Sequence, residues 1–264
     1  MGTTGDVRRV GLARALSKLG YCSRSQATEL IRAGRVKLNG ETRRDPETPV
    51  HVGRDRIEVD RRIVGAEAKV YLMLNKPRGV VTTASDEKGR DTVYSCLSEG
   101  LPWVAPVGRL DKATEGLLLL TNDSEWAARI SDPETHLDKI YHVQVGAQVG
   151  AIVDETLLAG MAKGIRCGDG EVLRAKQARV LRSGHHNTWL EIVLDEGKNR
   201  QIRRMLEASN IKVLRLVRVA IGPLVLGKLA KGTSRALSSD EKHAVDQAMK
   251  TPRAGLLLSG PQRA

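Results

Sequence analysis

Apolar residues near the start of the chain follow helical spacing. They recur at every third or fourth position over Val10–Leu19, which predicts a helix closed by Gly20. Ser23, with Gln26 three residues later, forms a capping-box pattern and predicts a second helix that ends near Gly34. The chain is therefore expected to open with two short helices in succession.

Strand spacing replaces helical spacing after the second predicted helix. Val36–Leu38 predicts a strand, and Asn39–Gly40 behind it is a residue pair that tight hairpin turns favour. Val50–Val52 and Arg56–Val59 predict two further strands. The order helix, helix, hairpin, strand predicts a small α/β unit over residues 10–60.

The polar stretch Arg61–Lys69 predicts a linker, and beyond it strand patterns outnumber helix patterns. Strands are predicted at Val70–Leu74, Val80–Thr83, Gly116–Thr121, Ile140–Val145, Val172–Leu181, Thr188–Leu194 and Val213–Ile221. Helices are predicted at Trp126–Ser131, Arg200–Ala208 and Ser239–Lys250. Because the strands do not alternate regularly with helices, we predict an α+β fold with a mixed, mostly antiparallel sheet. This domain is expected to span residues 70–250, with a disordered lead-in at 1–9 and a mobile tail at 251–264.

A strong positive charge narrows the class of partner. The 264 residues include 43 Lys and Arg against 31 Asp and Glu, a formal net charge of +12. Such a charge attracts polyanions, of which nucleic acid is the commonest and an anionic membrane surface the next. The longest apolar runs are too short to span a bilayer, and Met1–Arg9 lacks the apolar stretch of a signal peptide. We therefore expect a cytoplasmic protein that binds nucleic acid.

The residue types that hold metals or cofactors lack the spacing that such sites need. Cys22, Cys96 and Cys167 are widely separated, and the six His residues show no ligand spacing. Residues 227–234 resemble a phosphate-binding loop in composition but not in order. We therefore predict no metal site and no cofactor.

Basic residues gather on the second predicted helix and on the strand after it. They are Arg24, Arg32, Arg35 and Lys37. A basic edge suits the phosphate backbone of a nucleic acid, although such charges can also merely solvate one face. The stretch Leu12–Asp60 resembles an S4 RNA-binding domain. The segments that carry the resemblance are Leu16–Gly20, Ser23–Ala27, Gly34–Gly40 and Asp55–Val59. It implies binding to RNA and does not say which reaction follows.

A candidate catalytic carboxylate lies in the segment from Gly108 to Asp111, ahead of the apolar run at 116–121. The predicted strand would fix this loop, and Arg109 and Lys112 would keep the Asp111 carboxylate ionised. A fixed, ionised Asp can act as a nucleophile or a base. From spacing alone, the alternative is a loop Asp that pairs structurally with Arg109.

The stretch Gly108–Asp123 is similar to the signature of pseudouridine synthases of the RsuA type, bacterial enzymes that modify ribosomal RNA. Lys139–Val143 and Glu196–Met205 match further family segments, and the similarity runs in order over about residues 10–240. It implies that Asp111 is catalytic, that Tyr141 contacts the target base and that Arg203 pairs with the carboxylate. It also implies a flipped-out base and no cofactor. Without the resemblance, Tyr141 could equally be a core aromatic on an alternating strand.

The segment Lys198–Arg218 is strongly basic, with seven Lys or Arg residues against Glu207 alone. A solvated helix face rarely needs such a bias, which favours an RNA groove. Further candidate RNA-binding residues are Arg109, Lys198, Arg200 and Arg204. Arg109 would fill the space that the base leaves or contact a phosphate. The form of Asn199–Met205 resembles family members that act on large-subunit (23S) rRNA.

Three functions remain open from the sequence. The first is an rRNA uridine-to-pseudouridine isomerase, expected to act as a monomer on 23S rRNA or on a large-subunit assembly intermediate. The second is a non-catalytic S4-type RNA-binding or ribosome assembly factor, which would not need Asp111 and Arg203. The third is a nuclease or glycosidase with paired acids, for which Glu115 is the only nearby second acid, and its place before Gly116 suggests a structural role.

Overall fold

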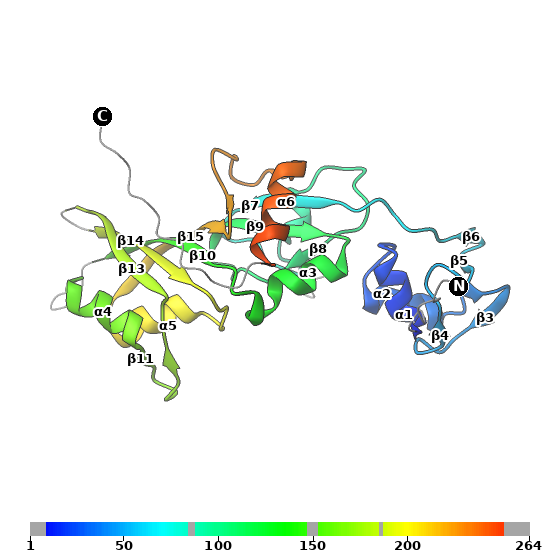
Figure 1. Cartoon of the computed structure of the whole chain (residues 1–264), viewed down its shortest axis with the longest axis horizontal. Coiled ribbons are helices and arrows are strands. Elements are labelled where there is room, and N and C mark those ends of the chain that lie inside the picture. Colours follow the sequence, from blue (N-terminus) through cyan, green and yellow to red (C-terminus); the bar gives the residue numbers. More distant parts are fainter. Residues whose placement is uncertain (1–8, 84–87, 147–152, 185–186, 251–264) are drawn as a thin grey trace, which may run out of the picture. The chain divides into compact units, whose positions relative to one another are not determined.

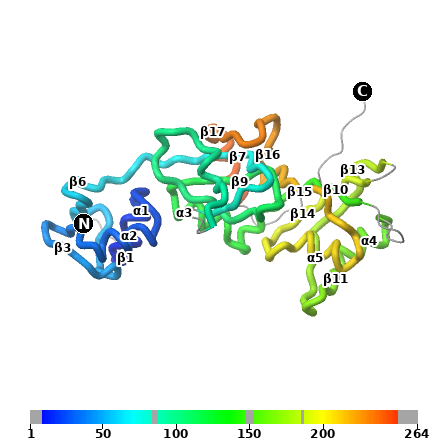
Figure 2. The backbone as a smooth tube through the Cα atoms, turned by 180° about the vertical axis from the view of Figure 1, so that it is seen from behind, coloured from blue at the N-terminus to red at the C-terminus, as the bar shows by residue number. Residues whose placement is uncertain are grey.

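The computed structural model describes residues 9–83, 88–146, 153–184 and 187–250 (Figures 1 and 2). The chain divides into two compact units, and we describe each by itself. Unit 1 comprises Met1–Ser131 and Lys228–Leu237, and unit 2 comprises Asp132–Gly227 and Ser238–Ala264. The predicted lead-in, except its last residue, and the predicted tail lie outside the described residues.

The first part of unit 1 has the helix, helix, hairpin, strand order that the sequence predicts. Its elements are β1 (Val10–Gly11), α1 (Leu12–Lys18), α2 (Arg24–Arg32), β2 (Val36–Leu38), β3 (Glu41–Arg43), β4 (Pro49–Val50), β5 (Ile57–Val59) and β6 (Arg62–Ile63). Ser23 and Gln26 form the predicted capping box at the start of α2. Asn39 and Gly40 both have positive φ, at 52° and 88°, as a tight hairpin turn between β2 and β3 requires. Four antiparallel strands in the order β3-β2-β5-β6 share a core with the two helices.

The rest of unit 1 is a second antiparallel assembly. Its elements are β7 (Tyr71–Lys76), η1 (Val93–Cys96), β8 (Ala105–Val107), β9 (Glu115–Thr121), α3 (Ser124–Ser131) and β17 (Ser234–Ala236). β7 pairs with β9 and β17, and β8 pairs with β9. Every residue of β9 is buried, as its apolar run predicts. β9 therefore gives a rigid base to the loop that precedes it.

Unit 2 is built on four long antiparallel strands in the order β13-β14-β10-β15. Its strands are β10 (Lys139–Gly146), β11 (Ile165–Arg166), β12 (Val172–Leu173), β13 (Gln177–Ser183), β14 (Asn187–Leu194), β15 (Lys212–Ile221) and β16 (Leu224–Val225). Its helices are η2 (Pro133–Thr135), α4 (Glu155–Lys163), α5 (Gln201–Ala208) and α6 (Ser239–Ala248). α4 and α5 lie on the same side of the long strands (Figure 1).

One face of the long strands of unit 2 forms its core. Burial alternates strictly along β10, where Tyr141, Val143 and Val145 are buried and the residues between them are half-buried. α5 buries Ile202, Met205 and Leu206. Because α5 packs against β15, this is the face that the helix covers. We call it the inner face, and the opposite one the outer face.

The α+β class and the mostly antiparallel pairing are confirmed, but several element predictions need correction. Val80–Thr83 is not a strand, and only Val81 forms a bridge, a parallel one to Thr92. The strand predicted at Val172–Leu181 is two strands, β12 and β13. The sequence patterns did not predict α4. β6 lies within the predicted linker at 61–69. No helix in the described part of the chain is long and apolar enough to cross a membrane.

Candidate active site

The loop that carries Asp111 joins β8 to β9 in unit 1. Gly108 opens it with φ +70°, a left-handed conformation that glycine adopts without strain. Leu110 is buried and Asp111 is half-buried. The Thr114 N–H donates to the Asp111 carbonyl at 2.9 Å and closes a turn beneath Asp111. The loop is thus a defined turn whose backbone is held at Asp111.

A buried lysine supports this turn from below. Lys76, at the end of β7, is 0% exposed, and its Nζ donates to the carbonyls of Pro77 at 3.1 Å, Asp111 at 3.1 Å and Thr114 at 2.9 Å. Burial lowers the pKa of the Lys76 ammonium to about 8, although the nearby carboxylates of Asp111 and Glu115 oppose the shift. The ammonium therefore donates to three backbone carbonyls, one of which is that of Asp111 itself.

The segment between β7 and η1 braces the same loop from the side. The Thr82 hydroxyl donates to the Leu110 carbonyl at 2.8 Å, and the Gly79 N–H donates to the Lys112 carbonyl at 2.8 Å. The local sequence predicts a strand here, but Thr82 uses its polar group on the Asp111 loop instead. Loop residues on both sides of Asp111 are held, which limits the positions its carboxylate can take.

Glu115 is the nearest other acid along the chain to Asp111. It is 3% exposed, and its Oε2 lies 2.5 Å from Nζ of Lys231. An acid that is buried in an ion pair at the start of β9 serves the structure. This agrees with the structural role expected for Glu115 and argues against a pair of catalytic acids.

Tyr141 lies on the inner face of unit 2, in the middle of the long strands. It is 9% exposed and stands opposite Ile192 of β14 and Arg218 of β15. Arg218 is 5% exposed, so a buried cation is the direct cross-strand neighbour of this tyrosine. Arg218 was predicted only as part of the basic segment 198–218 and not as a neighbour of Tyr141. Tyr141 therefore has a buried charged neighbour, unlike a tyrosine in an ordinary apolar core.

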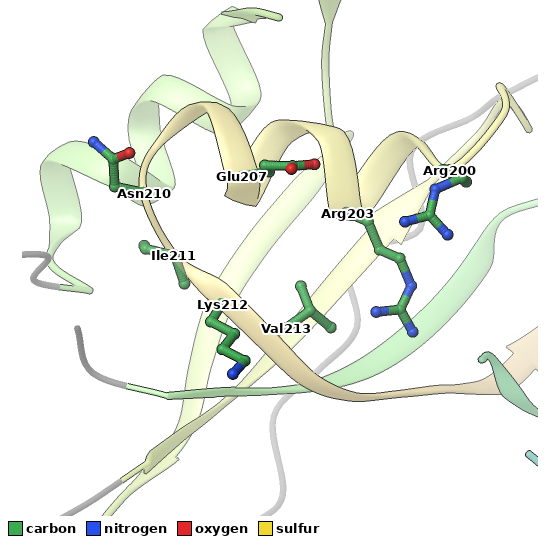
Figure 3. A pocket seen from close by; sticks show the side chains of 7 residues that line it. All are labelled: Arg200, Arg203, Glu207, Asn210, Ile211, Lys212 and Val213. Atoms are coloured by element: carbon green, nitrogen blue, oxygen red, sulfur yellow. The ribbon is translucent and has the colours of Figure 1, made fainter. Parts of the chain in front are cut away.

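Arg203 lies in the first turn of α5 and lines a cavity of about 320 Å³ between this helix and the start of β15 (Figure 3). The other lining residues are Arg200, Glu207, Asn210, Ile211, Lys212 and Val213. Figure 3 shows the side chains of Arg200 and Arg203 on the same end of the helix. Three cations against one acid make this cavity suited to an anionic group.

Two of the predicted RNA-binding cations near α5 form ion pairs inside unit 2. Arg204 binds the carboxylates of Asp169 and Glu171, the latter at 2.8 Å. Lys198 lies 3.3 Å from Glu171 and 3.6 Å from Glu196. Hydrogen bonds to Glu171 and then to Asp169 raise the pKa of Arg204 above its ordinary value. These charges are therefore partly neutralised by the protein itself.

The basic residues of the first part of unit 1 are arranged differently. Arg24, Arg32 and Lys37 are exposed on α2 and β2, as the sequence analysis expects. Arg35 forms an ion pair with Asp60, which lowers the pKa of that carboxyl. Three of the four predicted cations thus present their charge at the surface.

The predicted site residues are divided between the two units. Asp111 and the exposed Arg109 belong to unit 1, whereas Tyr141 and Arg203 belong to unit 2. Lys76 and Thr82, which hold the Asp111 loop, were not predicted as site residues. The signal for Lys76 was its place in the polar run after the strand predicted at 70–74, whereas Thr82 lay in a segment predicted as a strand. Among the described residues, no group of His, Cys, Asp or Glu side chains could hold a metal ion.

Comparison with known families and structures gives consistent results along the chain. A family model described as RNA pseudouridylate synthase matches residues 70–208, and an S4 domain model matches residues 10–57. An uncharacterized RNA pseudouridine synthase of Aquifex aeolicus is 41% identical over 233 residues, which cover 88% of this chain and 92% of the relative.

Two further similarities concern a relative with a stated substrate and a solved structure. The ribosomal large subunit pseudouridine synthase B of Bacillus subtilis is 38% identical over 231 residues, which cover 87% of this chain and 93% of the relative. A crystal structure of a pseudouridylate synthase is 32% identical with a TM-score of 0.62, and the match covers 89% of this chain and 99% of that chain.

Proposed function

The chain belongs to the RNA pseudouridylate synthase family, and we propose that it converts a uridine of large-subunit (23S) ribosomal RNA to pseudouridine with Asp111 as its catalytic residue. Membership of this family identifies the chain as an enzyme that isomerises uridine in RNA. Similarity to the Bacillus subtilis large-subunit enzyme supports the choice of substrate. The S4 domain at residues 10–57 adds a module for binding RNA.

The reaction breaks the N-glycosidic bond of uridine, turns the uracil and rejoins it to the ribose through C5. C5 loses a proton and the freed N1 gains one, so the product is an isomer of the substrate. It requires a carboxylate held at a constant position while the base rotates. The observation that carries the proposal is the support of the Asp111 loop by Lys76, with hydrogen bonds of 2.9–3.1 Å to three carbonyls. Such an anchor fixes the backbone of the loop by hydrogen bonds, and its positive charge lies close enough to act on the Asp111 carboxylate.

Tyr141 and Arg203 complete the proposed site. Arg203 would bind the Asp111 carboxylate by a charge-assisted hydrogen bond and keep it ionised. Tyr141 would stack on the uracil after the nucleotide leaves its helix. The other two cations of the cavity beneath α5, Arg200 and Lys212, would receive a phosphate of the flipped nucleotide or of a neighbour. The placement of both residues on or beside the inner face of unit 2 supports this division of roles.

An rRNA substrate also suggests how the enzyme binds RNA and where it acts. The exposed Arg24, Arg32 and Lys37 would hold the RNA backbone and orient the rRNA. We propose that the enzyme acts as a monomer in the cytoplasm, where rRNA is transcribed and assembled. Neither the reaction nor the proposed residue roles call for a metal or a cofactor.

The decisive experiment is tritium release from rRNA that carries tritium at C5 of uracil. The parent chain should release label from 23S rRNA or from a large-subunit assembly intermediate, and Asp111→Asn should release none while binding the same RNA. Asp91→Asn is the matched control, because it removes an exposed loop carboxylate of unit 1 and should leave release unchanged. A parent chain that releases no label from any rRNA substrate would contradict the proposed function.

The position modified is found by mapping pseudouridines in rRNA from a strain that lacks this protein. One 23S uridine should stay unmodified and should regain modification with the parent gene but not with Asp111→Asn. If the missing pseudouridine lies in small-subunit rRNA instead, the proposed activity stands but the proposed 23S substrate is wrong.

A further inference from the structure

The outer face of unit 2 carries a row of side chains that the proposed function does not use. Arg182 of β13 stands opposite Trp189 of β14, Trp189 opposite Gln144 of β10, and Gln144 opposite Arg215 of β15. Directly opposed residues of antiparallel strands point to the same face. We call Arg182, Trp189, Gln144 and Arg215 the outer row.

The two arginines of the outer row both lie over the tryptophan ring. The Cζ atom of Arg182 is 5.1 Å from the Trp189 ring centroid, and that of Arg215 is 6.0 Å from it. Arg182 is exposed, and the other three members are half-buried. A register shift at Leu181 brings Arg182 opposite Trp189, because without the extra residue Leu181 would take that position. The strand is thus irregular where it presents a cation to the aromatic ring.

The charge of this sheet favours an anionic partner. Its four long strands contain one acidic residue, Glu191. Their basic residues are Lys139, Arg179, Arg182, Lys212, Arg215 and Arg218. Glu191 lies two residues along β14 from Trp189, on the same face and outside the outer row. There Arg179 donates to it at 2.7 Å, and Nε2 of His142 lies 3.4 Å from its carboxylate. The Glu191 carboxylate therefore binds the neighbouring Arg179, and the outer row itself contains two arginines and no acidic residue.

We propose that the outer row is a second RNA-binding surface, on which an unpaired base of the substrate RNA stacks and its neighbouring phosphates bind Arg182 and Arg215. This proposal rests on the proposed function only in taking the RNA to be rRNA. Planar aromatic and guanidinium groups are the surfaces on which single-stranded bases stack, and arginine forks bind phosphate oxygens in pairs. Because the phosphates of RNA are anionic, the excess of positive charge suits this occupant and would repel a basic protein.

The outer row and Tyr141 lie on opposite faces of the same strands, so their effects on the reaction separate. Along β10, Gln144 belongs to the outer face, whereas Tyr141, Val143 and Val145 belong to the inner face. A ligand on the outer row cannot touch the reacting uridine if that uridine stacks on Tyr141. The outer row therefore contributes to affinity for rRNA around the target and not to the chemical step.

The test compares three variants of the full chain in RNA binding and in tritium release. Trp189→Leu keeps an apolar side chain but removes the ring, and Arg182→Gln with Arg215→Gln removes the two cations. Arg179→Gln is the matched control, since it removes a cation from the same face that is paired with Glu191. Circular dichroism and thermal unfolding confirm that each variant is folded.

Trp189→Leu should weaken the Kd for an rRNA fragment about tenfold, in the range of base stacking on an aromatic ring. The double Arg variant should weaken it and also reduce the dependence of log Kd on log salt by about one to two. In both Trp189→Leu and the double Arg variant, KM should rise in step with Kd. The kcat at saturating RNA should stay within about twofold of the parent value. Arg179→Gln should stay within about twofold in Kd.

Parent-like Kd values in both variants would overturn the proposal and leave the row as a structural stack. Unchanged Kd for bare rRNA, with weaker binding to large-subunit particles, would also overturn it and indicate a protein partner. Binding is measured whether or not label is released. A parent chain that binds rRNA through the outer row but never releases label would contradict the proposed function alone.

Discussion

The Asp111 loop of unit 1 and helix α5 of unit 2 use their cations in opposite ways. Beneath the loop, Lys76 is fully buried and gives all its hydrogen bonds to backbone carbonyls. Arg204 on α5 and Lys198 just before it are only partly covered and bind carboxylates of Asp169, Glu171 and Glu196. One cation sets the position of the backbone, and the other two balance the charge of their neighbours.

The difference shows that the acceptor decides what a cation does. Carbonyl oxygens bind the Lys76 ammonium but do not cancel its charge. Burial of that charge therefore lowers the pKa of Lys76 to about 8. Carboxylates neutralise their partners, so Arg204 and Lys198 offer RNA less charge than a count along the sequence suggests. Arg203 lines the cavity beneath α5.

Arg203 gives the largest expected effect in this comparison. Arg203→Gln should lower kcat for tritium release about 10²- to 10³-fold, the scale on which loss of one placed charge partner slows an enzyme. RNA affinity should change less than about threefold. Arg203→Lys keeps the charge but loses the planar fork, and should recover part of the rate. A variant with normal kcat and weaker RNA binding would make Arg203 an ordinary phosphate contact.

Lys76 gives the next largest effect, and it should appear in stability as well as in rate. Lys76→Met leaves three carbonyls without their donor and should lower the free energy of unfolding by about 2–3 kcal/mol. Urea unfolding measures this loss, and tritium release should fall because Asp111 is less firmly held. Lys112→Met, at an exposed position of the same loop, should cost less than about 0.5 kcal/mol. Equal stability of the two variants would refute the anchoring role.

The depressed pKa of Lys76 predicts a pH dependence with a definite sign. Between about pH 8 and its ordinary value near 10.5, the native ammonium loses its proton while the unfolded chain keeps it. The unfolded state then binds more protons, so native stability rises with pH in this window. Unfolding of the parent and of Lys76→Met should therefore diverge further above pH 8, in favour of the parent. A constant difference from pH 7 to 10 would show that burial does not depress this pKa.

Patterns confined to neighbouring residues predicted much of the fold. The capping box of Ser23 and Gln26, the buried strand β9 and the alternating strand β10 depend on residues within a few positions of one another. α4 escaped notice because its apolar stripe is weak, with Met161 as its one buried residue. Val80–Thr83 has the β-branched residues of a strand, but only Val81 finds a backbone partner there, in a single bridge to Thr92.

The roles of the cations could not be predicted in this way. Lys76 reaches the carbonyl of Asp111 across 35 residues, and Arg204 reaches Asp169 across the same separation. Spacing within one strand or helix contains no information on such partners, so a buried anchor and a paired surface charge look alike in sequence. Asp111, Tyr141 and Arg203 were identified through family resemblance, and their joint action stays a prediction.

Arg204 provides the smallest expected effect and the sharpest contrast with Arg203, its neighbour on α5. Because Asp169 and Glu171 already bind its guanidinium, Arg204→Gln should change the Kd for rRNA less than about twofold and leave the salt dependence of binding as it is. It should lower the melting temperature slightly at low salt and less at high salt, because screening weakens ion pairs at the surface. Asp169→Asn should reproduce part of the thermal effect, since it removes one of the two carboxylates that bind Arg204. A loss of RNA affinity as large as that from removing Arg24 and Arg32 together would mean that Arg204 leaves its carboxylates for the RNA, and the contrast between the two regions would then hold only for Lys76.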